Sequence, residues 1–308
     1  MKWQVKFFKN SIIGVLPILI QAKARNIKRS IFPHKLEIDI RTLNQGLQQV
    51  HMLATCGIDP SNKDYLELGT GWSPVIPLVF YLAGCKSLTL IDSQRLMDDH
   101  TFQETCRQLI GHSQEISLKI KIERQSVENK LAELASMPLK SAMSLINGNY
   151  LAPYDLLNNN IPDQSIDIVT SRAVLEHIPQ NIVIKILDEF NRLLRQDGAM
   201  CHIIDNSDHW EHNDKTICRL NFLKYSQTTF NLISTMNPLD YQNRLRHSQY
   251  KKMIEDAGFM IVSDESPSDD KTLNDLKSLK IHPLFSQFSM QDLAVLTSYI
   301  VATKRWNF

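Results

Sequence analysis

The sequence predicts an α/β protein built on a doubly wound, mainly parallel sheet. Short apolar segments alternate with segments of helical periodicity from about residue 60 to residue 205, a pattern typical of parallel strands covered by helices on both faces. A glycine-rich turn follows the first apolar segment, and an acidic residue ends the second. Both features are typical of the carboxyl edge of a sheet that binds a nucleoside.

The first expected element is an amphipathic helix over 39–57, because Leu43, Leu47, Val50 and Ala54 recur at helical spacing. The elements expected after it are strands at 64–68 and 86–91, helices at 96–110 and 127–134, a strand at 144–146, a loop at 149–164, a strand at 166–170, a helix at 182–194 capped by Asp197-Gly198, and a strand at 199–204.

The stretch 205–247 does not fit a crossover between strands. It is polar and rich in histidine, asparagine and aromatic residues, and it is too long for a plain connection in a compact domain. We interpret it as a functional insertion that caps the substrate side. A helix at 248–257 follows, and strands at 259–262 and 294–302 complete the predicted sheet.

The turn after the first strand predicts the kind of ligand. Gly69 and Gly71 allow the chain to turn sharply and to approach a ligand without a Cβ in the way. A dinucleotide fingerprint would have a third glycine where Pro74 stands, and Trp72 is too bulky for a phosphate cradle. Glu67 would repel a phosphate but suits a cation. These features favour S-adenosyl-L-methionine (SAM) and disfavour a nicotinamide-dependent oxidoreductase.

Asp92 ends the second strand. A carboxylate in this place can accept hydrogen bonds from both ribose hydroxyls of a nucleoside. The alternative is a helix N-cap, a position that aspartate also favours.

These segments resemble the class I SAM-dependent methyltransferases. Residues 66–71 look like the first motif of that family, Ile91-Asp92 looks like the second, and residues 165–178 look like the fourth strand and the loop after it. The resemblance covers roughly residues 60–205. It implies a seven-stranded, Rossmann-like sheet whose last strand is reversed, and it implies an enzyme with SAM as its cofactor. It does not name a substrate.

The resemblance also implies which residues bind SAM. The turn would meet the methionine part and Asp92 would hold the ribose. Asn149 stands where the family often has an aspartate near adenine, so the chain departs from the pattern there. Ser171 and Arg172 follow the fourth strand, at the edge where ligands bind, although Arg172 would equally suit a surface ion pair. The complete predicted set is Glu67, Gly69, Thr70, Gly71, Asp92, Asn149, Ser171 and Arg172.

Three histidines are the candidates for catalysis. His177 closes the fourth-strand motif, and His209 and His212 lie in the segment 208–214, which leaves the fifth strand at the same edge. Methyl transfer mainly requires alignment, but an oxygen acceptor must also lose a proton, which an imidazole accepts near neutral pH. A structural role for His177 and a solvated loop at 208–214 are the alternatives. Histidine and carboxylate together could also bind a divalent metal, but the residue spacing is not diagnostic of such a site, and none is expected.

The expected function is methyl transfer from SAM to a small-molecule acceptor, with a hydroxyl of a glycan or of a natural-product precursor as the acceptor group. A nucleic-acid partner is not expected, because the net charge is +1 and the signature of amino-methylating DNA enzymes is absent after the fourth strand. The alternative is a non-catalytic scaffold or membrane-associated module with the same fold.

The predicted domains are a helical N-terminal extension over 1–58 and the catalytic domain over 59–308. The extension is basic and carries the apolar run Ser11–Ile20, broken by Pro17. This imitates a secretory signal, but we favour a lid over the active site or, as the alternative, a peripheral anchor on anionic lipid. The five dispersed cysteines predict reduced thiols and a cytoplasmic location. The sequence does not predict the oligomeric state.

Overall fold

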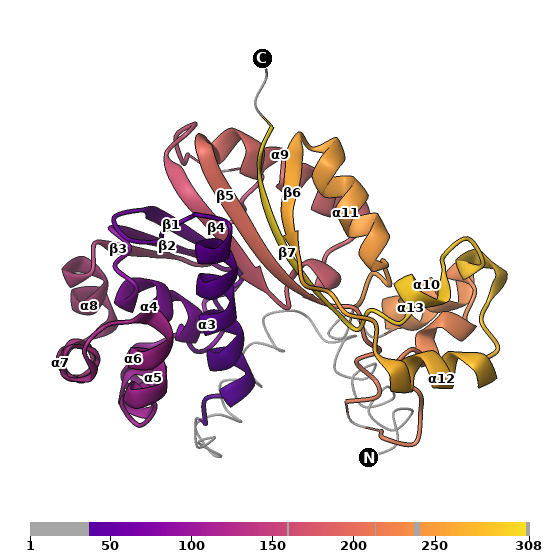
Figure 1. Ribbon diagram of the computed structural model, residues 1–308, viewed down its shortest axis with the longest axis horizontal. Helices are drawn as coiled ribbons and strands as arrows, with labels where there is room; N and C mark the ends of the chain where they lie inside the picture. Colours follow the sequence, from indigo (N-terminus) through magenta and orange to yellow (C-terminus); the bar gives the residue numbers. More distant parts are fainter. Residues whose placement is uncertain (1–36, 159, 213, 237–240, 306–308) are drawn as a thin grey trace.

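The computed structural model describes residues 37–158, 160–212, 214–236 and 241–305, and every structural statement below concerns these residues. A seven-stranded sheet runs through them in the order β3-β2-β1-β4-β5-β7-β6 (Figure 1). The strands are β1 Asp64–Leu68, β2 Ser87–Ile91, β3 Gly148–Leu151, β4 Ile166–Arg172, β5 Leu194–Asp205, β6 Phe259–Asp264 and β7 Thr297–Lys304.

Strands β1 to β5 pair in parallel, and β7 runs antiparallel to both of its neighbours. The chain winds from β1 toward β3 on one side and from β4 toward β6 on the other, so the direction of winding switches between β1 and β4. Leu68 pairs with Ser171 at the carboxyl ends of these two strands. Ligands of doubly wound sheets bind at this switch point. The predicted fold, including the reversed last strand, is confirmed.

The helices cover both faces of the sheet. They are α3 Ile40–Thr55, α4 Val75–Leu82, α5 Asp99–Ile110, α6 Ser113–Ile120, α7 Arg124–Ala135, α8 Leu139–Leu145, α9 Gln180–Leu193, α10 Gln227–Met236, α11 His247–Asp256, α12 Asp270–Ser278 and α13 Met290–Leu293, with short 3₁₀ turns η1 Leu175–His177, η2 Asn221–Lys224 and η4 Pro283–Phe285.

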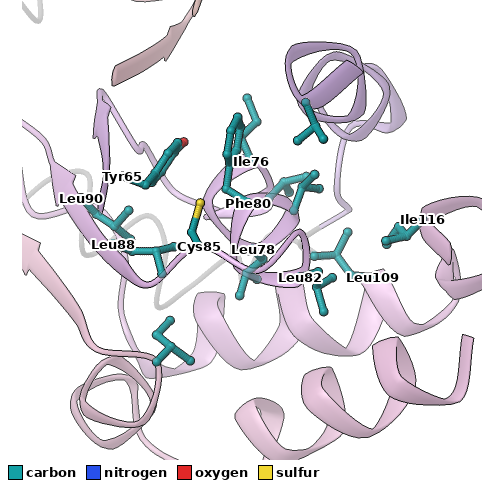
Figure 2. Packing of buried hydrophobic residues seen from close by; sticks show 14 of the residues in the cluster. Tyr65, Ile76, Leu78, Phe80, Leu82, Cys85, Leu88, Leu90, Leu109 and Ile116 are labelled. Atoms are coloured by element: carbon teal, nitrogen blue, oxygen red, sulfur yellow. The ribbon is translucent and has the colours of Figure 1, made fainter. Parts of the chain in front are cut away.

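Alternate residues of each strand feed two separate cores. Tyr65 and Ile168 face helices α3 to α8, whereas Leu66 and Val169 face α9 and α11, as the two-residue period of a strand requires. In the first core the rings of Tyr65 and Phe80 stack with their centroids 4.4 Å apart (Figure 2). Burial of both strand faces explains why these strands read as nearly continuous apolar runs.

A third apolar cluster forms a helical cap beyond the carboxyl end of β5 (Figure 1). It joins two stretches of chain that are distant in sequence, the insertion after β5 and the connection between β6 and β7. Its buried members include Trp210, Phe222, Phe230, Leu276 and Phe285. The insertion was predicted. The helices α12 and α13 of the second stretch were not.

Two local predictions are wrong. The strand expected at 144–146 is the end of helix α8, because Leu139, Ala142, Met143 and Ile146 are buried at helical spacing. The third strand follows at Gly148–Leu151 and takes up the start of the predicted loop. Asn149 therefore lies within a strand instead of after one.

Asp197-Gly198 does not cap helix α9. The helix ends at Leu193 and β5 begins at Leu194, with an irregularity where the register shifts between Ile166 and Ile168 of β4. A Cβ on Gly198 would lie 2.9 Å from the carbonyl oxygen of Arg195, so the glycine serves a strand irregularity, where such residues are common.

The N-terminal extension is described only from residue 37 onward. Helix α3 packs in the first core, and Gln49 donates hydrogen bonds to the carbonyls of Ser171 and Cys201 in β4 and β5. The predicted lid, signal or anchor over residues 1–36 lies outside the described residues. Among those described, no helix combines the length and the apolar character that crossing a membrane requires.

Candidate active site

Three adjoining clefts open at the carboxyl ends of β1, β2 and β4. The turn cleft, of about 450 Å³, is lined by Glu67 and the glycine turn. The Asp92 cleft, of about 440 Å³, is lined by Asp92 and by residues 154–157. The histidine cleft, of about 670 Å³, is lined by His177, Asp205, His209 and His212. Ala173 lines all three, so the clefts meet at one point.

The turn after β1 has the geometry that its glycines predicted. Gly69 has a φ of +81° and Gly71 a φ of +70°, both in the left-handed region that favours glycine. A Cβ on Gly69 would lie 2.3 Å from Cγ2 of Val174, so a side chain there would push the turn away from the loop after β4. The positive φ and the closeness of Val174 both require glycine at position 69, so only backbone atoms line the clefts there.

Glu67 is the buried charge-bearing group of the turn cleft. Its side chain is only 4 % exposed, and its Oε2 has no hydrogen-bond partner among the described residues. Burial raises the pKa of Glu67, and the nearby Asp92 raises it further. The Thr70 hydroxyl lowers it in part, and the resulting pKa is about 8. A positively charged ligand would supply the missing partner and favour the ionised form.

Asp92 joins the end of β2 to the glycine turn. Its Oδ2 accepts a hydrogen bond of 2.9 Å from the N–H of Gly71, and its Oδ1 accepts one of 2.9 Å from the N–H of Gln94. A carboxylate has about four acceptor sites, so two remain for a ligand in the Asp92 cleft. Asp92 does not cap a helix, because helix α5 begins at Asp99 and Asp98 is its N-cap, so the N-cap alternative is wrong.

Asn149 is not placed as predicted. It pairs with Thr89 across β2 and β3 and lines a separate cleft on the outer side of the sheet. Sequence reasoning missed the residues that follow β3 into the Asp92 cleft, because it placed this strand too early. They are Tyr154, Asp155, Leu156 and Leu157. The acidic Asp155 beside Leu156 was the signal that could have identified them.

Ser171 and Arg172, the last two residues of β4, point to different sides of the sheet. Ser171 is 1 % exposed and its hydroxyl lies 2.8 Å from Nδ1 of the buried His202, so it faces the core and none of the three clefts. Arg172 lines the turn and histidine clefts, and its Nε donates to Gln45. Ala173, which sequence reasoning missed, has a φ of +53°, a strained conformation of the kind found at functional sites.

The structure brings together the three predicted histidines. The ring centroids of His177 and His209 are 4.9 Å apart, and those of His209 and His212 are 4.8 Å apart. Asp205, at the end of β5, directs its Oδ2 at both neighbours, 3.4 Å from Nε2 of His209 and 3.7 Å from Nε2 of His212. Although burial raises the pKa of Asp205, His209 and Ser207 hold it at about 2, so the carboxylate is ionised.

The last residues of the insertion hold this cluster in place. The carbonyl of Tyr241 lies 2.9 Å from Nδ1 of His177, and the side-chain oxygen of Gln242 accepts from the N–H of His209 at 3.2 Å. Asn243 donates to two carbonyls that flank the 3₁₀ turn η1. Sequence reasoning missed these positioning residues, because hydrogen bonds between distant segments leave no periodic signal.

A family model described as "Methyltransferase domain" matches residues 41–264. None of the curated proteins matches the sequence.

Among solved structures, the chain is similar to a SAM-dependent methyltransferase from Mesorhizobium loti, at 11% identity, with 85% of this chain and 100% of that one covered and a TM-score of 0.46. It is similar to magnesium protoporphyrin IX methyltransferase from Synechocystis with bound S-adenosylhomocysteine, at 10% identity, with 92% and 94% covered and a TM-score of 0.46. It is also similar to phosphoethanolamine N-methyltransferase 2 from Haemonchus contortus in complex with SAM, at 15% identity, with 84% and 52% covered and a TM-score of 0.44. At these identities the likeness concerns the fold alone.

Proposed function

Because this chain belongs to the methyltransferase domain family, and is therefore an enzyme that uses SAM, we propose that it methylates a small molecule bound in the histidine cleft. One observation carries the proposal. The histidine cleft shares Arg172 and Ala173 with the turn cleft, and it shares His177 and Ala173 with the Asp92 cleft. A methyl group presented where the two cofactor clefts meet would therefore face the histidines.

The residues of the two cofactor clefts fit SAM. When bound, SAM supplies an electrophilic methyl group on a positively charged sulfur. Oε2 of Glu67, which has no hydrogen-bond partner among the described residues, suits the positive charges of its methionine part. The remaining acceptor sites of Asp92 suit the ribose hydroxyls. Leu156 and Leu157, with Tyr154, provide an apolar wall for the adenine.

The histidine cleft favours an acceptor with a hydroxyl. Its volume of about 670 Å³ lies within the range of small-molecule sites. An imidazole of the cluster would take the proton of the hydroxyl. The carboxylate of Asp205, 3.4 Å from Nε2 of His209, would orient that ring. We therefore propose O-methylation, with a glycan or a natural-product precursor as the acceptor.

Acceptor pairs that differ only in the reacting group test this proposal. Radiolabelled SAM is incubated with the full-length protein and with matched compounds that carry a hydroxyl or an amine at the same position. We expect transfer to the hydroxyl compound. His177→Ala, His209→Ala and His212→Ala are then compared with His51→Ala, which removes an exposed imidazole on α3.

Loss of the true base should lower turnover about 10²–10⁴-fold and leave SAM affinity nearly unchanged. Transfer to the amine alone would contradict O-methylation. If all three variants retain wild-type turnover at neutral pH, catalysis proceeds by alignment alone.

A further inference from the structure

The carboxylate and the two imidazoles at the end of β5 have the spacing of metal ligands. We propose that Asp205, His209 and His212 bind one divalent metal ion at the floor of the histidine cleft. Each residue offers one ligand atom, and the three atoms lie within 4.8 Å of one another. The spacing of these residues in the sequence is not diagnostic of a metal site, because Asp205 is the last residue of a strand and meets the histidines only through the fold of the following loop.

The distances distinguish metal ligands from hydrogen-bond partners. Oδ2 of Asp205 lies 3.4 Å from Nε2 of His209 and 3.7 Å from Nε2 of His212. An N–H···O hydrogen bond would bring these atoms to about 2.7–3.2 Å. Two ligands placed about 2.1 Å from a tetrahedral metal ion lie about 3.4 Å apart. The observed separations are longer than those of ordinary hydrogen bonds and closer to those of two ligands on one metal ion.

Burial at the site indicates a missing partner. Nε2 of His209 is inaccessible to solvent, and among the described residues it makes no well-formed hydrogen bond. Its polar neighbour among them is Oδ2 of Asp205, at 3.4 Å, a longer contact than a buried imidazole nitrogen normally makes. A metal ion between Asp205 and the two rings would satisfy this nitrogen together with the carboxylate.

Neighbouring residues hold the ligands as metal sites require. Oδ1 of Asp205 accepts from the N–H of Ser207 at 2.9 Å and from its hydroxyl at 2.6 Å, which leaves Oδ2 for the metal. Gln242 fixes the backbone of His209. Supporting contacts of this kind orient metal ligands and tune the affinity of the site.

The ligand set indicates which metals fit. Two imidazoles and one carboxylate suit Zn²⁺ or Co²⁺, whereas Mg²⁺ and Ca²⁺ prefer oxygen ligands alone. Three protein ligands leave a coordination position open, as in catalytic zinc sites. The three ligands all line the cleft that we assign to the acceptor.

The role of the metal in catalysis rests on the proposed function. A metal-bound hydroxyl loses its proton more readily, so the metal would activate the acceptor oxygen. His209 and His212 would then be ligands, and His177 would be the imidazole that accepts the proton. Metal binding itself does not depend on SAM or on the acceptor and can be measured without either.

Cobalt absorption tests the site directly. The untagged full-length protein is treated with a chelator, dialysed and titrated with Co²⁺, and Zn²⁺ is then added in competition. We expect a saturable visible absorption at one equivalent of Co²⁺, which Zn²⁺ abolishes. Asp205→Asn, His209→Ala and His212→Ala should each weaken Co²⁺ binding at least about tenfold. His51→Ala is the control, since it removes an exposed imidazole on α3.

Three results decide the matter. Absence of saturable Co²⁺ binding in the wild type would overturn the proposal, as would unchanged binding in both Asp205→Asn and His209→Ala with native circular dichroism. Calorimetry with SAM on the same samples separates this site from the proposed function. Loss of Co²⁺ binding in the variants supports the site, even if the wild type proves unable to bind SAM.

Discussion

Glu67 illustrates how a single residue combines an energetic cost with a binding role. Its carboxyl group is buried at the end of β1, beside the glycine turn and close to Asp92. Burial makes ionisation unfavourable, so the group is mostly protonated at neutral pH when no cationic ligand is bound. Asp92, by contrast, is tied to the turn by two backbone N–H groups. The two carboxyls therefore predict different experimental behaviour.

Replacement of Glu67 should alter the dependence of stability on pH. The pKa of Glu67 rises from 4.5 to about 8 in the folded protein, so the native state binds more protons than the unfolded state between these values. The free energy of unfolding should fall as pH rises through this window. Glu67→Gln should lack this contribution, which denaturant unfolding at several pH values would detect. Equal pH dependence in both proteins would contradict the assignment.

SAM binding should also release a proton from Glu67. At pH 7 the carboxyl is mostly protonated, and a cationic ligand favours its ionised form. Calorimetry in buffers of different ionisation enthalpy should show that the wild type releases a larger fraction of a proton than Glu67→Gln does. The variant should also bind SAM more weakly. Identical proton release by the two proteins would mean that Glu67 does not contact the charged groups of SAM.

Loss of the carboxylate at position 92 should weaken SAM binding. Hydrogen bonds to charged groups contribute about 1.5–3 kcal/mol each, so we expect Asp92→Ala to cost roughly 2–4 kcal/mol of binding free energy after partial compensation by water. Asp64→Ala is the matched control, because Asp64 is a half-buried carboxylate at the opposite end of β1, paired with Arg195. Calorimetry showing equal SAM affinity in the two folded variants would refute the ribose contact.

At the scale of elements, the loop after β4 connects all three clefts. Val174 packs against the position of the missing Cβ of Gly69, Ala173 lines every cleft, and His177 joins the histidine cluster. A disturbance of the turn after β1 should therefore spread to this loop, while the strands behind it are held by the parallel ladder of the sheet.

A side chain at Gly69 should damage ligand binding more than folding. Gly69→Ala introduces a Cβ that meets Val174 at 2.3 Å, and it also places alanine at a φ of +81°. Gly57→Ala is the control, because Gly57 has a φ of +77° but no atom within 4 Å of the added Cβ. We expect Gly57→Ala to lose about 1–2 kcal/mol in stability from the backbone strain. Gly69→Ala should lose at least as much, because Val174 must also move, and SAM affinity should fall only in Gly69→Ala. Unchanged affinity would mean that the turn does not contact the cofactor.

At the scale of the whole molecule, the helical cap is a separate apolar unit whose two stretches meet at the buried side chain of Arg244. Arg244 donates to the carbonyls of Phe222 and Tyr225, and it lies 4.0 Å from the ring centroid of Phe230 and 5.1 Å from that of Phe285. It thus links both stretches of the cap. It also directly follows residues 241–243, which hold the histidine cluster.

Removal of Arg244 should loosen the cap without loosening the sheet. Arg244→Ala removes the guanidinium donors from the carbonyls of Phe222 and Tyr225, each at a cost of about 1–3 kcal/mol. We expect faster amide hydrogen exchange in residues 207–236 and 265–296, with unchanged exchange in β1, β2 and β4. Arg195→Ala breaks ion pairs with Asp64 and Asp167 at the opposite end of β1 and β4. It should speed exchange in these strands and leave exchange in the cap unchanged. Uniform acceleration across the chain would contradict a separable cap.

The sequence by itself determined the sheet, the cofactor and the turn that would meet it. Strand periodicity, the glycines at 69 and 71 and the acid at 92 are local patterns, because each depends on neighbours within a few residues. The same local reasoning failed at 144–151, where an apolar helix end resembles a strand and burial decides between them. That error displaced Asn149 from the predicted site and hid Tyr154 and Asp155.

Only the tertiary structure decided how the acceptor side is assembled. Asp205, His209 and His212 lie in a loop without periodicity, and His177 reaches them from the end of another strand. The hydrogen bonds from residues 241–243 and the backbone conformation of Ala173 depend on packing between distant segments. Contacts of this kind arise from the three-dimensional path of the chain. No local sequence pattern encodes the distances between these groups, and it is those distances that indicate a metal site.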